Sequence, residues 1–511
     1  MRISSVLMAG VMLVSASLAS AQTAAVAGTP AQPVSLEQLY PRIDQHFRDF
    51  RGSANIPGMV WGIVRDGQLV HVGSDGLRDL ESKQPPGPDT LFRIASMSKA
   101  FTALAILKLR DAGKLQLDAP AENYVPEMRG WKYPTSDSPK ITVRDLLSHV
   151  GGFVTDDPWG DRQTPLPEAE FTRMIKAGVP FARAPETAFE YSNFGYALLG
   201  RIVTNVSGRP YADFIQREIT RPLGMASTGY DVFASPQQRR ALGYRWENGS
   251  WDREPDMRHG AFGAMGGVQT SVNDYARWVA FLLSAWPARD GVEQGPVKRS
   301  SVRELAQGLS FLNPLERRAL EGGEPCRTAS AYAKGFGVSQ DCDLGKTMTH
   351  GGGYPGYGSY LLLLPDEGVG VFAFANRTYG APARPVFFAA LEMDKAGLLN
   401  GRSISVSPAL AEAYLGVAAI YASGTLEPGR KLLAMNFLMD RSSENWTKEL
   451  GSLKEKAGTC RTDSPLTVTG ALSGRFMWKC ERAEVNGNLL LAPTNPPTIQ
   501  SLNLEAASPK P

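Results

Sequence analysis

The predicted β-strands of this chain fall into two groups that lie far apart in the sequence. Residues 59–64 and 68–72 are predicted as two strands around Asp66-Gly67, a dipeptide typical of a tight hairpin turn. From about residue 111 to residue 329 the sequence indicates helices and loops, with many Pro and Gly residues. Short strands then return, at residues 347–349, 359–364 and 370–375. This order predicts an α/β fold: one antiparallel β-sheet, built from distant parts of the chain, flanked by helices on both faces and carrying an inserted helical subdomain.

The chain has 511 residues, too many for one ordinary hydrophobic core, so a second and smaller domain is expected. Beyond a linker-like segment, two predicted helices (409–422, 445–457) and three strands (466–470, 475–480, 489–492) indicate a separate α+β module. The predicted division is a signal peptide (1–21), a loose N-terminal segment (22–35), a main domain (36–398), a linker (399–407) and a small C-terminal α+β accessory domain (408–511).

The first residues have the pattern of a secretory signal peptide. Arg2 precedes the apolar run Val6–Leu18, and the small residues Ala19-Ser20-Ala21 suit cleavage after Ala21. The apolar run is shorter than the ~20 residues that a membrane-spanning helix needs. We therefore expect a periplasmic or secreted protein whose mature chain has no transmembrane segment.

The use of cysteine agrees with an oxidising compartment. The four cysteines form two close pairs, and proximity favours the disulfides Cys326–Cys342 and Cys460–Cys480, although four cysteines allow three connectivities. The C-x-x-C spacing of a zinc site is absent and the five histidines are scattered. The sequence therefore predicts neither a metal site nor a cofactor.

The charge balance gives no reason to expect nucleic acid or an anionic membrane as a partner. Lys plus Arg total 54 against 51 for Asp plus Glu, a net charge of +3 over the whole chain. The partner that we expect is a small-molecule or peptide substrate, and the oligomeric state stays open.

Ser96-Met97-Ser98-Lys99 begins a helical segment, predicted from Ser96 to Gly113, that is apolar almost all round. Positions i and i+3 share one face of a helix, so Ser96 Oγ and Lys99 Nζ can meet. Desolvation lowers the pKa of a lysine at the root of such a helix, and the neutral amine can then take the proton of the serine hydroxyl. Alone the tetrapeptide is unspecific, because such tetrapeptides occur by chance in long chains, and in isolation an ordinary helix start capped by Ser96 is the preferred interpretation.

A second element is Tyr191-Ser192-Asn193. A tyrosine phenol near a lysine can relay the serine proton to a leaving group, and an asparagine two residues on can hydrogen-bond a substrate amide. In isolation a loop tyrosine and a turn asparagine are the preferred interpretation of the same residues.

A third element is His350-Gly351-Gly352-Gly353, which follows a short predicted strand. Glycines at a strand edge let a substrate backbone approach closely. The backbone N–H groups of Gly353 and Ser96 can form an oxyanion hole, typically worth ~3 kcal/mol per donor. The alternative is a flexible Gly-rich turn between two strands.

Together the three elements resemble the serine β-lactamase-like hydrolases, which include class C β-lactamases, D-alanyl-D-alanine carboxypeptidases, D-aminopeptidases and related esterases. The pattern of that family is Ser-x-x-Lys, then Tyr-x-Asn, then Lys- or His-x-Gly, and it matches Ser96/Lys99, Tyr191/Asn193 and His350/Gly352. The resemblance extends over about residues 36–398. It includes further segments whose sequences are similar to the family, such as residues 146–152 and 222–225.

The resemblance implies that Ser96 forms an acyl-enzyme and that Lys99 and Tyr191 transfer the proton of the Ser96 hydroxyl. By the same resemblance, water then deacylates the acyl-enzyme. The resemblance also implies that Asn193 orients the amide on the acyl side. His350 is expected where a cationic or hydrogen-bonding group meets the carboxylate side of the substrate.

Two neighbouring residues are given other roles. His149 lies in one of the segments that resemble the family, residues 146–152. We expect it to fix a loop, with catalysis as the alternative. Ser98 is expected to be a bystander near the site.

One departure from the class C pattern concerns the substrate. Those enzymes carry Lys-Thr-Gly where this chain has His350-Gly351-Gly352, and a histidine there resembles the carboxypeptidases, peptidases and esterases of the family. The sequence therefore predicts an exported serine hydrolase acting on small peptides, D-residue and cell-wall-derived peptides included, or on carboxylic esters. Two alternatives stay open: a class C-like β-lactamase that hydrolyses β-lactam amides, and a non-catalytic, penicillin-binding sensor-like protein.

Overall fold

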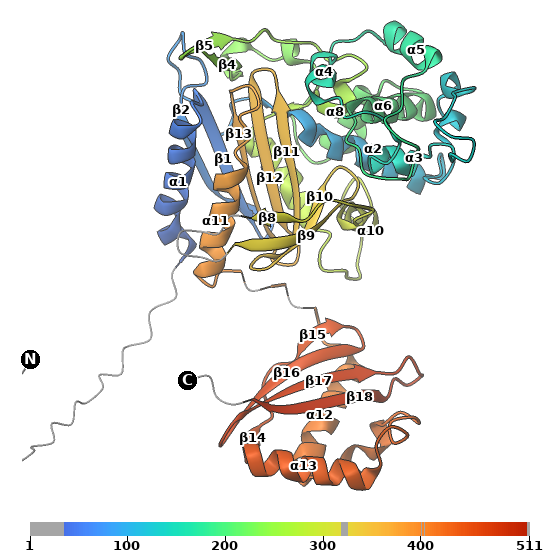
Figure 1. The fold of residues 1–511 in the computed structure, drawn as a ribbon. Helices are drawn as coiled ribbons and strands as arrows, with labels where there is room; N and C mark the ends of the chain where they lie inside the picture. The colour runs from blue at the N-terminus through green and yellow to red at the C-terminus, as the bar shows by residue number, and fades with distance from the viewer. Residues whose placement is uncertain (1–34, 318–324, 400, 403, 508–511) are drawn as a thin grey trace, which may run out of the picture.

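A nine-stranded antiparallel sheet dominates the computed structural model, which describes residues 35–317, 325–399, 401–402 and 404–507 (Figure 1). The predicted signal peptide and nearly all of the segment predicted to be loose lie outside the described residues. In spatial order the strands are β2 (Gln68–Gly76), β1 (Gly58–Arg65), β13 (Val369–Ala375), β12 (Tyr357–Leu364), β11 (Gly345–Tyr354), β10 (Gly337–Asp341), β9 (Cys326–Tyr332) and β7 (Ser310–Phe311), with β8 (Leu315–Arg317) also paired to β9.

The sheet joins the two ends of this part of the chain, as the sequence predicts. Asp66 and Gly67 both have positive φ, 50° and 79°, which a type I′ hairpin between β1 and β2 requires. β1 then pairs with β13 in an antiparallel register that sets Val60 opposite Phe374. β13 is buried along its whole length, so it is a central strand.

Helices cover both faces of this sheet, as predicted (Figure 1). On one face α1 (Leu36–Ser53) and α11 (Ala383–Lys395) pack against each other and bury Ile43, Phe47 and Val386. A larger apolar core on the other face contains the fully buried Phe101 and Trp278. The helices on that side are α2 (Lys99–Asp111), α3 (Val143–Leu147), α4 (Asp157–Arg162), α5 (Glu168–Ala177), α6 (Asn193–Ser207), α7 (Tyr211–Ile215), α8 (Gly263–Gly266), α9 (Val272–Leu283) and α10 (Arg299–Arg303). Two short ribbons accompany them, β3 (Phe92–Arg93) with β6 (Gln269–Thr270) and β4 (Tyr244–Glu247) with β5 (Ser250–Arg253).

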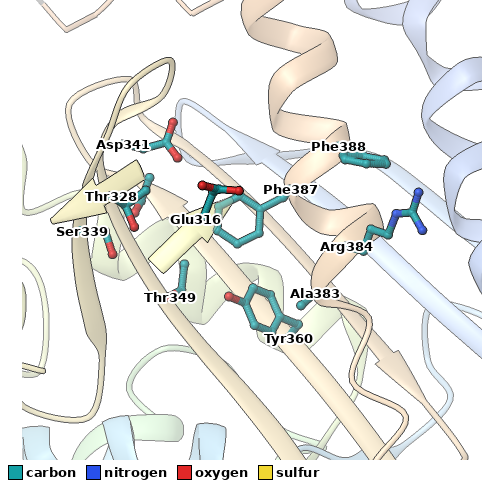
Figure 2. Close-up of a pocket in the computed structure, with 11 residues that line it drawn as sticks. Glu316, Thr328, Ser339, Asp341, Thr349, Tyr360, Ala383, Arg384, Phe387 and Phe388 are labelled. Carbon is teal, nitrogen blue, oxygen red and sulfur yellow. The ribbon is translucent and has the colours of Figure 1, made fainter. Parts of the chain in front are cut away.

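A cavity of about 460 Å³ remains on the α11 side of the sheet, between α11 and strands β8 to β12 (Figure 2). Its rings, Tyr360, Phe387 and Phe388, belong to the apolar cluster of α1 and α11. The cavity therefore opens on the face of the sheet opposite to α2.

Several strands differ from the sequence prediction. The segment predicted to contain only helices and loops contains β4 to β8 and the start of β9, and β10, which the sequence did not indicate either, follows β9. The inward positions of β9 are Cys326, Thr328, Ser330 and Tyr332, mostly small and polar, so the strand shows no hydrophobic alternation. β11 is also longer than predicted, since Gly351 to Gly353 lie inside the strand and not in a turn.

The C-terminal part contains a second antiparallel sheet with its own core. Its strands are β14 (Cys460–Arg461), β15 (Thr467–Gly470), β16 (Ser473–Cys480), β17 (Glu484–Leu491) and β18 (Ile499–Ala507), and its helices are α12 (Pro408–Ser423) and α13 (Ser443–Ala457). The sequence had not indicated β18. The apolar cluster of this part, which includes the fully buried Trp478, consists of residues from the same elements and their connections.

The two disulfides pair as proximity predicted. Cys460–Cys480 joins β14 to β16, and Cys326–Cys342 joins β9 to the residue after β10. Within the described residues, none of the helices has the length and apolar character that crossing a membrane would require.

Candidate active site

Ser96 lies in a 3-10 turn, η1 (Ala95–Ser98), which leads directly into α2. Ala95 has a φ of 49°, a left-handed conformation that is uncommon for a residue with a side chain. The turn is anchored from both sides, because Ile94 N–H donates to Val268 O (3.0 Å) and Ser359 Oγ donates to Ile94 O (2.7 Å). The hydroxyl of Ser98 accepts from Val268 N–H (3.0 Å), which gives that serine a structural contact of its own.

Lys99 is completely buried, and its ammonium reaches three oxygens. Nζ lies 3.1 Å from Ser96 Oγ, 2.7 Å from Asn193 Oδ1 and 3.1 Å from Met265 O. Burial lowers the pKa of Lys99 to about 8, although nearby carboxylates of α4 and of the residue before it favour the charged form. The neutral amine that can accept a proton is thus accessible close to neutral pH.

Tyr191 flanks the serine on its other side. Its side chain interacts with that of Ser96, and Lys99 Nζ lies 4.8 Å from the centre of its ring. Burial raises the pKa of Tyr191 well above the ordinary value of a phenol. The phenol therefore stays protonated, and it can pass a proton on rather than act as a phenolate base.

His149 holds the loop that carries Tyr191. Its Nδ1 accepts from Ser192 N–H (3.1 Å), its carbonyl accepts from Glu190 N–H (2.8 Å), and its ring lies 4.4 Å from that of Tyr191. Burial, with the charge of Lys99, lowers the pKa of His149 well below its usual range, so the ring is neutral. These contacts agree with the loop-fixing role expected from the sequence.

Asn193 begins α6 and is hydrogen-bonded to two carboxylates. Asp156 accepts from the backbone N–H groups of Asn193 (2.7 Å) and Phe194 (2.9 Å), and Asp157 Oδ1 accepts from Asn193 Nδ2 (3.0 Å). α4 packs closely here, because a Cβ on Gly160 would lie 2.7 Å from Asn193 Cβ. None of the three sequence elements includes this segment. The close spacing of its acidic residues, Asp156, Asp157 and Asp161, was the signal that could have indicated a carboxylate group beside the site.

His350 lies on β11 with both ring nitrogens engaged. Nδ1 lies 2.6 Å from Gly351 O, which only accepts, so Nδ1 carries the proton and Nε2 accepts from the Tyr332 hydroxyl (3.1 Å). Burial, together with the charge of Lys99, lowers the pKa of His350 to about 4. Its neutral state disfavours the cationic role expected for His350, and in this arrangement its one N–H is already donated to Gly351 O. Tyr332 belongs to β9, a strand that the sequence did not reveal.

Gly352 brings β11 against the turn of Ser96, and Gly353 lies against the Tyr379 ring. A Cβ on Gly352 would lie 2.4 Å from Ile94 O, and one on Gly353 would lie 2.5 Å from the Tyr379 ring. The pairing of β10 with β11 extends only to Gly337 opposite Thr349. Beyond that pair the β11 edge continues past β10, where a substrate backbone can approach.

Replacing Gly352 by alanine is expected to impair both folding stability and any reaction at Ser96. The added Cβ would lie 2.1 Å from Ser359 Oγ and 2.4 Å from the Ile94 carbonyl, so strand and turn must move apart. Overpacking of this kind costs about 1–3 kcal/mol of unfolding free energy. Denaturant unfolding measures the loss, and Gly351→Ala, whose Cβ would meet only the Tyr360 ring at 3.4 Å, is the control. Equal stability of the two variants would contradict the close approach.

An apolar cavity of about 370 Å³ lies beside the start of α6. Asp156 and Ser192 contribute to its wall, and the other lining residues are mostly apolar: Phe153, Val154, Thr155, Trp159, Met174, Val179, Pro180 and Phe194. An apolar group next to a polar reacting centre suits such a cavity.

A cluster of residue types able to hold a metal occurs elsewhere in the described chain, at Cys326, Asp341 and Cys342. The two sulfur atoms are bonded to each other in a disulfide, so they are not thiolate ligands.

Comparison with known proteins places this geometry in context. A model of the Beta-lactamase family matches residues 43–392. The chain is similar to "Protein flp" of Staphylococcus aureus strain N315, 29% identical over 348 residues, which are 66% of this chain and 62% of the relative. The D-alanyl-D-alanine-carboxypeptidase/endopeptidase AmpH of Escherichia coli K12 is 27% identical over 357 residues, 68% of this chain and 87% of the relative. The chain thus spans less than two thirds of the staphylococcal relative.

A solved structure shares the fold. The octameric penicillin-binding protein homologue from Pyrococcus abyssi superposes with a TM-score of 0.58 at 21% identity, and the match covers 91% of this chain and 97% of that one.

Proposed function

The chain belongs to the beta-lactamase family, and from this premise we propose that it is an exported serine hydrolase acting through an acyl-enzyme on Ser96. The contact of 3.1 Å between Lys99 Nζ and Ser96 Oγ carries the proposal, because it joins a hydroxyl nucleophile to a buried amine. A base within hydrogen-bond reach is what activates a serine. The phenol of Tyr191 on the other side of Ser96 supplies a route for the proton.

In the proposed acylation, neutral Lys99 takes the proton of Ser96 as Oγ bonds to the acyl carbon. Backbone N–H groups of Ser96 and Gly353 stabilise the resulting oxyanion, each by ~3 kcal/mol. The bond from the acyl carbon to the leaving group then breaks, and the leaving group receives the proton from the lysine by way of Tyr191. In deacylation a water molecule gives its proton to the same amine and adds to the acyl carbon. The ester bond breaks and Ser96 Oγ is protonated again.

The proposed substrates are small peptides, D-residue or cell-wall-derived peptides included, or carboxylic esters. The motif His350-Gly351-Gly352, in place of the Lys-Thr-Gly of class C β-lactamases, supports this choice over efficient β-lactam hydrolysis. The similarity to a protein named as a carboxypeptidase/endopeptidase points the same way. The apolar cavity beside Asn193 suits an apolar side group on the acyl portion.

Export and domain roles are also part of the proposal. Two disulfides support an oxidising compartment, periplasmic or extracellular, in line with the signal peptide predicted at residues 1–21. We assign the hydrolase chemistry to residues 36–398 and an accessory role to residues 408–511, with residues 399–407 as the linker.

A substrate panel tests the proposed function. Purified mature chain is assayed with nitrocefin, p-nitrophenyl acetate and D-amino-acid p-nitroanilides, and it is incubated with a fluorophosphonate probe for mass spectrometry. We expect turnover of the ester or the anilides above that of nitrocefin, with one probe molecule bonded to Ser96. If no adduct forms and Ser96→Ala behaves as the wild type on every substrate, Ser96 is not the nucleophile and the proposed function is wrong; if in addition neither protein turns over any substrate, the non-catalytic alternative holds.

The rate of the proposed reaction is expected to rise with pH. Only the neutral form of Lys99 accepts a proton, so kcat/KM for p-nitrophenyl acetate is expected to increase as pH passes through the pKa of about 8. His350 has already lost its proton far below this range, so it adds no second inflection there. A pH–rate profile between about pH 6 and 9 measures this. A profile that is flat or falls toward alkaline pH contradicts the assignment of Lys99 as the base.

A further inference from the structure

The segment 156–161 carries three carboxylates, Asp156, Asp157 and Asp161, and each accepts a hydrogen bond from a different partner. Asp156 accepts from the backbone at the start of α6, with 2.7 Å to Asn193 N. Asp161 accepts from the Tyr379 hydroxyl (3.1 Å). Asp157 alone among the three is bonded to a side chain that in turn contacts Lys99, because its Oδ1 accepts from Asn193 Nδ2 (3.0 Å).

These contacts form a continuous chain of hydrogen bonds from Asp157 to Ser96. Asn193 Nδ2 donates to Asp157, Asn193 Oδ1 accepts from Lys99 Nζ (2.7 Å), and Nζ contacts Ser96 Oγ (3.1 Å). A side-chain amide has donors at one end and an acceptor at the other, whereas a carboxylate only accepts. Asp157 therefore selects one of the two amide orientations. The flipped orientation would turn an NH₂ group toward the lysine and would lose both bonds.

We propose that Asp157 is a positioning residue, which fixes the Asn193 amide so that its oxygen holds the Lys99 amine against Ser96. The inference rests on the proposed function, and it adds a residue outside the three sequence elements. Asp157 does not touch the reacting atoms in this arrangement. It acts through the amide, from an element that packs against Asn193 without room for a side chain at Gly160.

The negative charge of Asp157 also affects the pH dependence of the reaction at Ser96, because it acts on the pKa of Lys99. The charged and titratable groups around Lys99 come from several elements: Asp156, Asp157 and Asp161 beside α6, Tyr191, Tyr196, His149 and His350. Of these, the three carboxylates favour the protonated lysine. Removing the charge of Asp157 thus lowers the pKa of Lys99, and the acid limb of the pH profile moves to lower pH.

The test is the rate of labelling by a fluorophosphonate probe, measured against pH in the full chain. Asp157→Asn is expected to reduce the rate on the alkaline plateau about 10–100-fold, the usual cost of a misplaced catalytic group. Its acid limb is expected at lower pH than in the wild type. Asp157→Glu, which retains the charge, is expected to keep the acid limb near its wild-type position. The exposed Asp137→Asn is the matched control, with no change in either quantity.

A double-mutant cycle separates positioning from a merely structural role. If Asp157 acts through the amide, Asp157→Asn is expected to slow labelling no further in an Asn193→Ala background. The inference is overturned if Asp157→Asn keeps the wild-type rate and profile, or if it slows labelling equally in both backgrounds. Thermal unfolding of each variant shows that it is folded, and Asp157→Glu carries the test should Asp157→Asn fail to fold. Absence of labelling in the wild type overturns the proposed function itself, whereas normal wild-type labelling with an unaffected Asp157→Asn overturns this inference alone.

Discussion

Replacing Ser96 by alanine is expected to lower kcat/KM by about 10⁴-fold or more on any substrate that the wild type hydrolyses. Alanine has no oxygen to bond to the acyl carbon, so the covalent route is lost and only binding and oxyanion stabilisation remain. The fluorophosphonate adduct is expected to disappear at the same time. The measurement is steady-state kinetics with p-nitrophenyl acetate and a D-amino-acid p-nitroanilide, together with intact-protein mass spectrometry.

The loss in Ser96→Ala is expected without a comparable loss of folding. The small Ser96 hydroxyl leaves a narrow space, and Lys99 keeps two oxygens within hydrogen-bond distance, Asn193 Oδ1 and Met265 O. The unfolding free energy is therefore expected to change by less than about 1 kcal/mol. An inactive variant with wild-type stability supports the nucleophile. Retained turnover in a folded Ser96→Ala would remove Ser96 from the chemistry.

Replacing Lys99 by glutamine is expected to lower kcat/KM by about 10³-fold, within the range that a general base contributes. Glutamine can still donate hydrogen bonds toward Asn193 and Met265, but its amide does not accept a proton near neutral pH. The inflection near pH 8 is expected to vanish from what activity remains, because the group that produces it is gone.

The matched control for this variant is Lys114→Gln, just beyond the end of α2, where the lysine is exposed. It removes the same charge from the same region of the chain, and we expect wild-type kinetics and pH dependence. If Lys99→Gln kept the inflection, the titrating base would be another group. A neutral effect of both variants would contradict the role of the buried amine altogether.

Much of the site could be predicted because its signals are local. Ser96 and Lys99 are three residues apart, so their meeting follows from helical geometry alone. The hairpin at Asp66-Gly67 follows in the same way from the positive φ values that this turn requires. Proximity was also sufficient for the two disulfides, whose partners are only 16 and 20 residues apart.

Other parts of the fold left little trace in the sequence. β9 alternates buried and exposed positions, but its buried residues include Thr328 and Ser330, so hydrophobic periodicity does not mark it. The hydroxyl of Tyr332 on that strand donates a hydrogen bond to His350 Nε2, and no local sequence pattern predicts this contact. His350 is neutral for a similar reason, since its burial is a property of the assembled sheet and helices.

The sequence alone predicted the candidate reactive groups and their order, and it correctly predicted the hairpin, the two disulfide pairs and an antiparallel sheet built from distant segments. The contacts among the candidate groups depend on the tertiary structure. The 2.7 Å contact between Lys99 and Asn193 joins residues 94 positions apart, and the bond of Asn193 to Asp157 comes from a third segment. The physical reason is that burial and Coulomb interaction depend on distance in space, so the pKa of Lys99 and the orientation of Asn193 exist only once α2, α4 and α6 are packed together.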